Sequence, residues 1–195
     1  MGIIEKKTDQ ELIKMYMDGD ECGLKTLIDR HKSKIYTSIY IRTQDAYLAE
    51  DIFQETFIKV INTIKSGRYN EEGKFLPWVI RIAHNMVIDH FRKEKRSPTV
   101  VNSDGYDIFE VLDFSEEDSE RKLVKQQMDV DLKRLIQKLP DDQKEVLIMR
   151  LFCDMSFKDI AEICQVSINT ALGRMRYALN NLRRMIDNHN LALQF

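Results

Sequence analysis

The sequence predicts an all-α protein made of two small helical domains joined by an acidic linker. The chain has 195 residues, of which 43% are hydrophobic and 32% are charged, proportions that suit a soluble, helix-rich protein. Only three prolines and seven glycines are present, and alternating apolar and polar runs typical of strands are absent. Apolar residues instead recur every three or four positions, which favours amphipathic helices. We expect the domains at residues 1–96 and 131–195.

Periodic apolar residues predict four helices in the first domain. Thr8 followed by Glu11 resembles a capping box that opens a short helix, and the polar run at residues 18–20 ends it. Pro77 opens the fourth helix, expected at residues 78–93. The apolar positions of the second helix are Leu24, Leu27, Ile28, His31, Ile35 and Ile39, and those of the third are Ala49, Ile52, Phe53, Thr56, Phe57, Val60 and Ile64.

Two short helical patterns separated by a tight turn predict a helix-turn-helix in the second domain. Ahead of it, Pro140 starts a helix with two acidic residues in its first turn, where the helix dipole favours them. Ser156 and Ser167 each precede a helical pattern and can cap its free N–H groups. Gln165 occupies the turn, where a left-handed backbone would favour glycine. The second helix of the motif repeats apolar residues that predict one buried stripe: Leu172, Met175, Leu179, Leu182 and Ile186.

The open face of this second helix is suited to DNA. No acidic residue lies between Ser167 and Ile186, so its arginines can approach phosphates without repulsion nearby. An ordinary packed helix pair with a solvated face is the alternative interpretation. Residues expected on or beside the open face are Ser167, Asn169, Thr170, Gly173, Arg174, Arg176 and Tyr177.

The distribution of charge agrees with contact to nucleic acid better than the formal net charge of −2 suggests. Residues 102–120 hold eight acidic side chains and no basic one, so the rest of the chain carries a net charge of +6. Residues 97–130 are interpreted as the linker, because apolar residues are sparse in their acidic part.

A basic stripe and an acidic cluster suggest two further surfaces in the first domain. Arg81, Asn85, Ile88 and Arg92 share one side of the fourth helix. Beside a loop with Arg68 and Tyr69, this stripe can follow a single nucleic-acid strand, although a solvated outer face is the simpler reading. The third helix instead presents an acidic cluster that suits a basic protein partner: Glu50, Asp51, Gln54 and Glu55.

No enzyme class is favoured by the residues. His84 and His90 are about 120° apart around their helix, so they do not form one metal-binding face. No nucleophile–base set or phosphate-binding loop is recognisable, and we expect no cofactor and no metal. The three cysteines form no Cys-x-x-Cys pair, which favours a reducing compartment. With neither a signal-peptide pattern nor a membrane-length apolar run, we expect a cytoplasmic protein.

These segments together resemble a bacterial RNA polymerase sigma factor of the extracytoplasmic-function (ECF) group. Residues 49–57 are similar to its polymerase-binding motif, and residues 75–92 to its −10 recognition helix. Leu139-Pro140 opens the second domain as in that family, and the helix-turn-helix corresponds to the −35 reader. The ending of the chain resembles ECF proteins of the Bacteroides lineage. Gln165 and the pair Gly173-Arg174 depart from the usual pattern, so the promoter sequence is not inferred.

The resemblance implies partners and roles. Core RNA polymerase would contact the acidic helix through the clamp helices of its largest subunit, and the second domain through the flap region. The −35 duplex would meet the helix-turn-helix, and an anti-sigma factor is a further expected partner. The alternative is a stand-alone helix-turn-helix regulator of duplex DNA. The implied polymerase-binding residues are Glu50, Asp51, Phe53, Gln54 and Glu55, and the implied −10 residues are Arg68, Tyr69, Asn70, Lys74, Arg81, Asn85 and Arg92.

Overall fold

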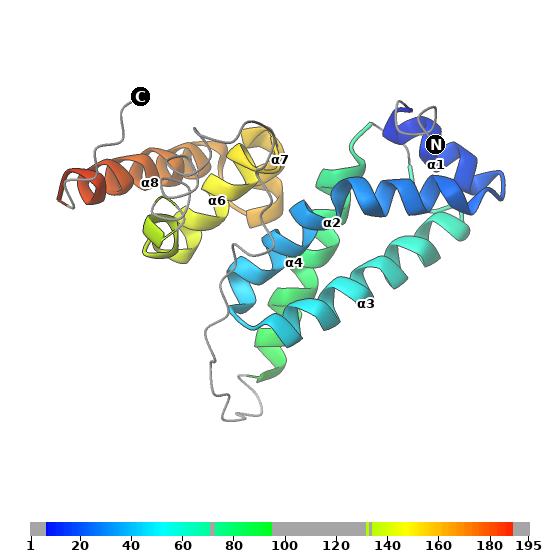
Figure 1. Ribbon diagram of the computed structural model, residues 1–195, viewed down its shortest axis with the longest axis horizontal. Helices are drawn as coiled ribbons and strands as arrows, with labels where there is room; N and C mark the ends of the chain where they lie inside the picture. Colours follow the sequence, from blue (N-terminus) through cyan, green and yellow to red (C-terminus); the bar gives the residue numbers. More distant parts are fainter. Residues whose placement is uncertain (1–6, 71–72, 95–131, 133, 189–195) are drawn as a thin grey trace, which may run out of the picture. The chain divides into compact units, whose positions relative to one another are not determined.

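The computed structural model describes residues 7–70, 73–94, 132 and 134–188, and every regular element in them is a helix (Figure 1). The chain divides into two compact units, Met1–Tyr106 and Asp107–Phe195. The all-α prediction is therefore confirmed. The predicted linker at residues 97–130 lies outside the described residues.

Four helices form the first unit, as the sequence predicts. Thr8 and Glu11 form the expected capping box at the start of the first helix. The fourth helix begins at Phe75 rather than at residue 78, because the amide of Trp78 already donates to the carbonyl of Lys74 at 3.0 Å. Pro77 therefore lies within the first turn, where a missing N–H group costs no helical hydrogen bond. The helices are α1 (Asp9–Met17), α2 (Glu21–Thr43), α3 (Ala46–Lys65) and α4 (Phe75–Glu94).

The core of this unit is the shared apolar surface of the four helices. The apolar positions predicted for α2 and α3 are buried, except Ile28 and Phe53, which are half-buried. Burial of such side chains is the main favourable term in forming the unit. Side chains that are at most 1% exposed come from all four helices: Leu12, Leu27, Ile35, Ile39, Val60, Ile80 and Val87.

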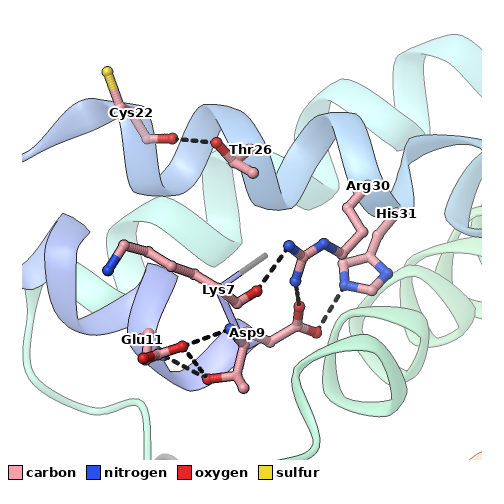
Figure 2. Close-up of polar contacts among 8 residues, drawn as sticks. Lys7, Asp9, Glu11, Cys22, Thr26, Arg30 and His31 are labelled. Carbon is pink, nitrogen blue, oxygen red and sulfur yellow. Dashed lines mark hydrogen bonds and ion pairs between the residues drawn. The ribbon is translucent and has the colours of Figure 1, made fainter. Parts of the chain in front are cut away.

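Figure 2 shows how polar contacts join α1 to α2. The Asp9 carboxylate accepts a hydrogen bond from Arg30 Nη1 at 2.7 Å, and its other oxygen lies 2.8 Å from His31 Nε2. Arg30 also donates to the carbonyl of Lys7 at 2.8 Å. Burial alone raises the pKa of Asp9, but the hydrogen bonds and charges of His31 and Arg30 outweigh it and hold the pKa below its ordinary value. A partly buried ionic cluster thus fastens α1.

Two glycines let α1 approach its neighbours closely. A Cβ atom on Gly23 would lie 2.3 Å from the carbonyl oxygen of Leu12, so only glycine fits at this crossing of α1 and α2. A Cβ atom on Gly73 would lie 3.1 Å from the side-chain nitrogen of Gln10. The helix α1 therefore also lies against the loop that connects α3 to α4.

The second unit contains α6 (Asp141–Leu151), α7 (Phe157–Cys164) and α8 (Ile168–Asn188), and residues 134–137 are also helical. The helix α6 begins after Pro140 with two aspartates in its first turn, as predicted. Between α7 and α8, Gln165 adopts a φ of +55°, the left-handed turn that the sequence suggested. This geometry, which favours glycine, makes the turn tight enough to set α8 against α7.

The buried stripe predicted for α8 is wrong at two of its positions. Leu172 is 43% exposed and Leu179 is 37% exposed, whereas Ala171 and Ala178 are fully buried. The buried face is thus turned by one residue toward the alanines, and it keeps Met175 and Leu182. Small side chains let two helices approach closely, and a pattern that weights large apolar residues misses this arrangement.

No helix in the described part of the chain is long and apolar enough to cross a membrane.

Candidate nucleic-acid interfaces and an acidic helix face

Ser167 caps the N-terminus of α8. Ser167 Oγ accepts a hydrogen bond from the Thr170 amide at 3.0 Å and lies 2.8 Å from the Thr170 hydroxyl. Ser156 caps α7 in the same way, accepting from the Asp159 amide at 3.1 Å. Both predicted caps are confirmed. In α8 the backbone N–H donor is thus satisfied by a neutral hydroxyl, and no carboxylate caps the helix end that is expected to meet DNA.

The structure places the predicted −35 residues on one side of the first turns of α8, which we call the recognition face. Gly173 has open space around it, since an added Cβ would meet no atom within 4 Å. Tyr177 is 64% exposed and extends this face along the helix. Its other members are exposed or half-buried: Ser167, Asn169, Thr170, Arg174 and Arg176.

Two features of the recognition face were not found from the sequence. Leu172, taken for a core residue, is exposed beside it together with Ile168, so the face includes apolar contact surface. Arg174 forms an ion pair with Asp142 of α6, with 3.2 Å between Nε and Oδ2. The lack of acidic residues from Ser167 to Ile186 is a signal for the face, but nothing in the local pattern points to a carboxylate from another helix.

The predicted stripe on α4 is a continuous outer surface. Arg81, Asn85 and Arg92 are exposed, and Ile88 between them is half-buried. Arg92 lies 3.6 Å from Asp89 in an exposed ion pair. Ion pairs as exposed as this one contribute little to stability, so Arg92 can leave Asp89 and pair with a phosphate at little cost.

The loop between α3 and α4 combines exposed polar residues with a buried aromatic ring. Arg68 donates through Nε to the Ser66 hydroxyl at 2.9 Å, and Asn70 and Lys74 are exposed. Tyr69, which the resemblance places among the −10 residues, is a buried residue of this loop. It is only 9% exposed, and its ring centroid lies 4.4 Å from that of Trp78. Packing against the apolar start of α4 removes the ring from water, which is favourable for an aromatic side chain.

The acidic cluster on α3 forms an exposed ridge, defined as Glu50, Asp51, Gln54 and Glu55. Gln54 donates to Glu50 Oε1 at 3.1 Å, one turn away. Phe53 is half-buried behind the ridge, with its ring 6.1 Å from that of Tyr36. Burial raises the pKa of Tyr36, and the negative charges of Glu50 and Asp45 raise it further. The ridge therefore produces a negative potential that a neighbouring ring already experiences.

A groove of about 470 Å³ between α3 and α4 brings the ridge and the loop together. Glu55 of the ridge and Arg68 of the loop both line it, so the two surfaces adjoin. In the described residues no group of three His, Cys, Asp or Glu side chains is placed to hold a metal ion. The other residues that line the groove are Ile58, Lys59, Asn62, Thr63 and Met86.

Two family models match this chain. The sigma-70 region 2 model matches residues 27–97, and the sigma-70 region 4 model matches residues 129–181. The RNA polymerase sigma-H factor of Pseudomonas aeruginosa is 28% identical over 179 residues, which cover 89% of this chain and 91% of that protein. The ECF RNA polymerase sigma factor SigW of Bacillus subtilis is 29% identical over 178 residues, covering 89% and 94%.

Solved structures share the fold. The sigma factor RpoE from Bartonella quintana, in complex with the anti-sigma factor NepR, is similar with a TM-score of 0.62 and 19% identity over 84% of this chain and 96% of that chain. CnrH in complex with the cytosolic domain of CnrY is similar with a TM-score of 0.60 and 17% identity, covering 93% and 99%. Regions 2 and 4 together span more than half of the sequence, and the chain belongs to the ECF group of sigma factors.

Proposed function

We propose that this chain binds core RNA polymerase and directs promoter-specific initiation through separate contacts with the −10 and −35 elements. The observation that carries the proposal is a separation of charge between two exposed helix faces. The ridge on α3 is acidic, whereas α8 has no acidic residue from Ser167 to Ile186. A protein that bound only DNA would gain nothing from the acidic ridge, and a protein that bound only polymerase would not need the recognition face.

The first proposed domain, residues 1–96, joins polymerase and melted DNA. Its ridge, with Phe53 behind it, is suited to the basic surface of the polymerase clamp helices. The loop residues Arg68, Asn70 and Lys74 and the α4 stripe would bind the non-template strand of the −10 element. Melting costs stacking energy of about 1–2 kcal/mol per base-pair step, so binding of the released strand must offset it.

The second proposed domain, residues 131–195, would place the recognition face of α8 in the major groove of the −35 duplex. Arg and Asn side chains recognise base edges or phosphates there. Residues 97–130 would thread through the polymerase, where their negative charge takes the place of RNA. The flap region of polymerase would contact the second domain.

Further parts of the proposal rest on the relatives. One solved neighbour, the sigma factor RpoE, is in complex with the anti-sigma factor NepR, which supports an anti-sigma partner for this chain. We propose a cytoplasmic protein without catalytic activity or cofactor. The assignment to the Bacteroides type rests on the resemblance at the end of the chain, where residues 189–195 lie outside the described part.

Run-off transcription with purified core polymerase and a genomic promoter library tests this function directly. We expect addition of the chain to direct initiation from a subset of promoters that share two separated motifs. Failure to bind core polymerase, or initiation no more selective than with core alone, would contradict the proposal. Tight operator binding without polymerase would favour the stand-alone regulator instead.

A further inference from the structure

An acidic residue from α6 reaches the recognition face of α8. Asp142 Oδ2 lies 3.2 Å from Arg174 Nε, with exposed side-chain fractions of 50% and 26%. Farther along α8, Asn181 donates to Gln143 of the same first turn of α6 at 2.8 Å. The first turn of α6 therefore contacts α8 at two points, and only the Asp142 contact involves a residue of the recognition face.

This contact limits the orientation of the Arg174 side chain. A guanidinium is rigid and planar, and Nε is its atom paired with the Asp142 carboxylate at 3.2 Å, so this attraction favours orientations that keep the Nε edge toward α6. The Arg174 pair with Asp142 is made through Nε, and the side chain is 26% exposed to solvent. The opposite edge of the guanidinium is therefore the part that a ligand can reach.

Other nearby charges do not explain the position of Asp142. Asp141, in the same turn, is paired instead with Lys144 at 3.2 Å, so it is not directed at α8. The helix dipole favours a carboxylate at either position. A carboxylate beside a DNA-binding face weakens attraction to phosphates for every sequence, so Asp142 carries a cost in general DNA affinity that its distance from Arg174 makes larger than for Asp141.

We propose that Asp142 is a positioning residue for sequence readout, which holds Arg174 so that its Nη edge faces a guanine of the −35 duplex. The inference rests on the proposed function and deepens it. Recognition of guanine O6 and N7 by arginine requires the guanidinium plane to align with the base edge. Contact with a phosphate has no such requirement, since it depends mainly on charge. Asp142 would thus lower the affinity for DNA of any sequence while increasing the discrimination at one base pair.

The test uses the full chain bound to core polymerase and a pool of promoter fragments with a randomised −35 element. Sequencing of the selected fragments measures the preference at each position, and binding to fragments without the element measures general affinity. In D142A we expect the preference for guanine at one position to fall roughly tenfold, with other positions unchanged. General affinity should be equal to the wild-type value or tighter, because a negative charge is removed.

Matched variants separate this role from a structural one. D141A removes the same charge from the same turn and should leave every preference unchanged. R174K keeps the positive charge but lacks the planar fork, so it should lose the same preference as D142A, and the double variant should lose no more. D142E, which can restore the contact, should recover the preference and also guards against a folding defect in D142A.

Two results would overturn the proposal, and they are distinguishable. If the wild-type holoenzyme has a −35 preference that D142A retains, the role of Asp142 is wrong while the proposed function stands. An equal loss at all positions in D142A would likewise show a merely structural contact. If the wild-type holoenzyme has no −35 preference at all, the proposed function fails, and this role fails with it.

Discussion

The outer faces of α3 and α8 are both exposed helical surfaces, yet they have opposite charge and different caps. The helix α3 is capped by Asp45, whose carboxylate accepts from the Leu48 amide at 3.0 Å, and its outer face is the acidic ridge. The helix α8 is capped by the neutral hydroxyl of Ser167 and carries no acid as far as Ile186. Local stability would be served by a carboxylate in either place, so the difference reflects the surface each helix has to meet.

Reversing the charge of the ridge should have the largest effect. E50K combined with D51K is expected to weaken binding to core polymerase about 100-fold, because a basic partner surface would then face like charges. Fluorescence anisotropy of labelled chain against core polymerase measures this loss. D29K, which changes an exposed acid on α2, is the control and should bind normally. If the double variant bound core polymerase with unchanged affinity, the ridge would not be the polymerase-binding surface.

Removing a cation from the recognition face should have an effect of about one order of magnitude. R176A is expected to weaken binding of the holoenzyme to promoter DNA about tenfold and to reduce the salt slope by about 1. Affinity for core polymerase should not change. The same truncation at Arg183, farther along α8, is the matched control and should cost less. A loss of core affinity in R176A would show that the two faces are not functionally separate.

Exchanging the two caps sharpens the comparison. S167D keeps a good capping residue, so the free energy of unfolding should change by no more than about 0.5 kcal/mol. The new charge lies close to DNA, however, and should weaken promoter binding about fivefold. D45S is the reciprocal change, and it should leave both core binding and DNA binding within twofold of wild type. Chemical denaturation and titration with promoter DNA give the two readouts.

The smallest effect concerns the electrostatic field of the ridge. The pKa of Tyr36 is raised by burial and also by Glu50 and Asp45, so E50Q should lower this pKa toward the ordinary tyrosine value. The phenol Cζ carbon resonance of Tyr36, followed against pH by NMR, reports its ionisation. D51N is the control, since Asp51 is not among the causes of the shift. An unchanged Tyr36 titration in E50Q would mean that the ridge does not act on this ring.

Features set by neighbouring residues were predicted well from the sequence. The caps at Thr8, Ser156 and Ser167 depend only on hydrogen bonds across three residues, and a local pattern contains all that is needed. The exposed acids of α3 were also identified, because charged side chains rarely enter a core without a partner.

Features set by contacts between helices were not predicted. Tyr69 is buried because Trp78 lies next to it, and Leu172 is exposed because Ala171 takes the close packing position. The pairing of Asp142 with Arg174 joins two helices that are separated in the sequence by α7. Periodicity gives the faces of one helix, but it does not say which face meets which neighbour.

The crossing at Gly23 links the beginning of the chain to the proposed promoter-melting surface. Because a Cβ atom on Gly23 would lie 2.3 Å from the carbonyl oxygen of Leu12, G23A would force α1 away from α2 at this crossing. The side chain of Gln10, which lies beside Gly73, would move with α1. We therefore expect the G23A chain to assemble with core polymerase but to open promoters poorly, although the added carbon is remote from any proposed DNA contact.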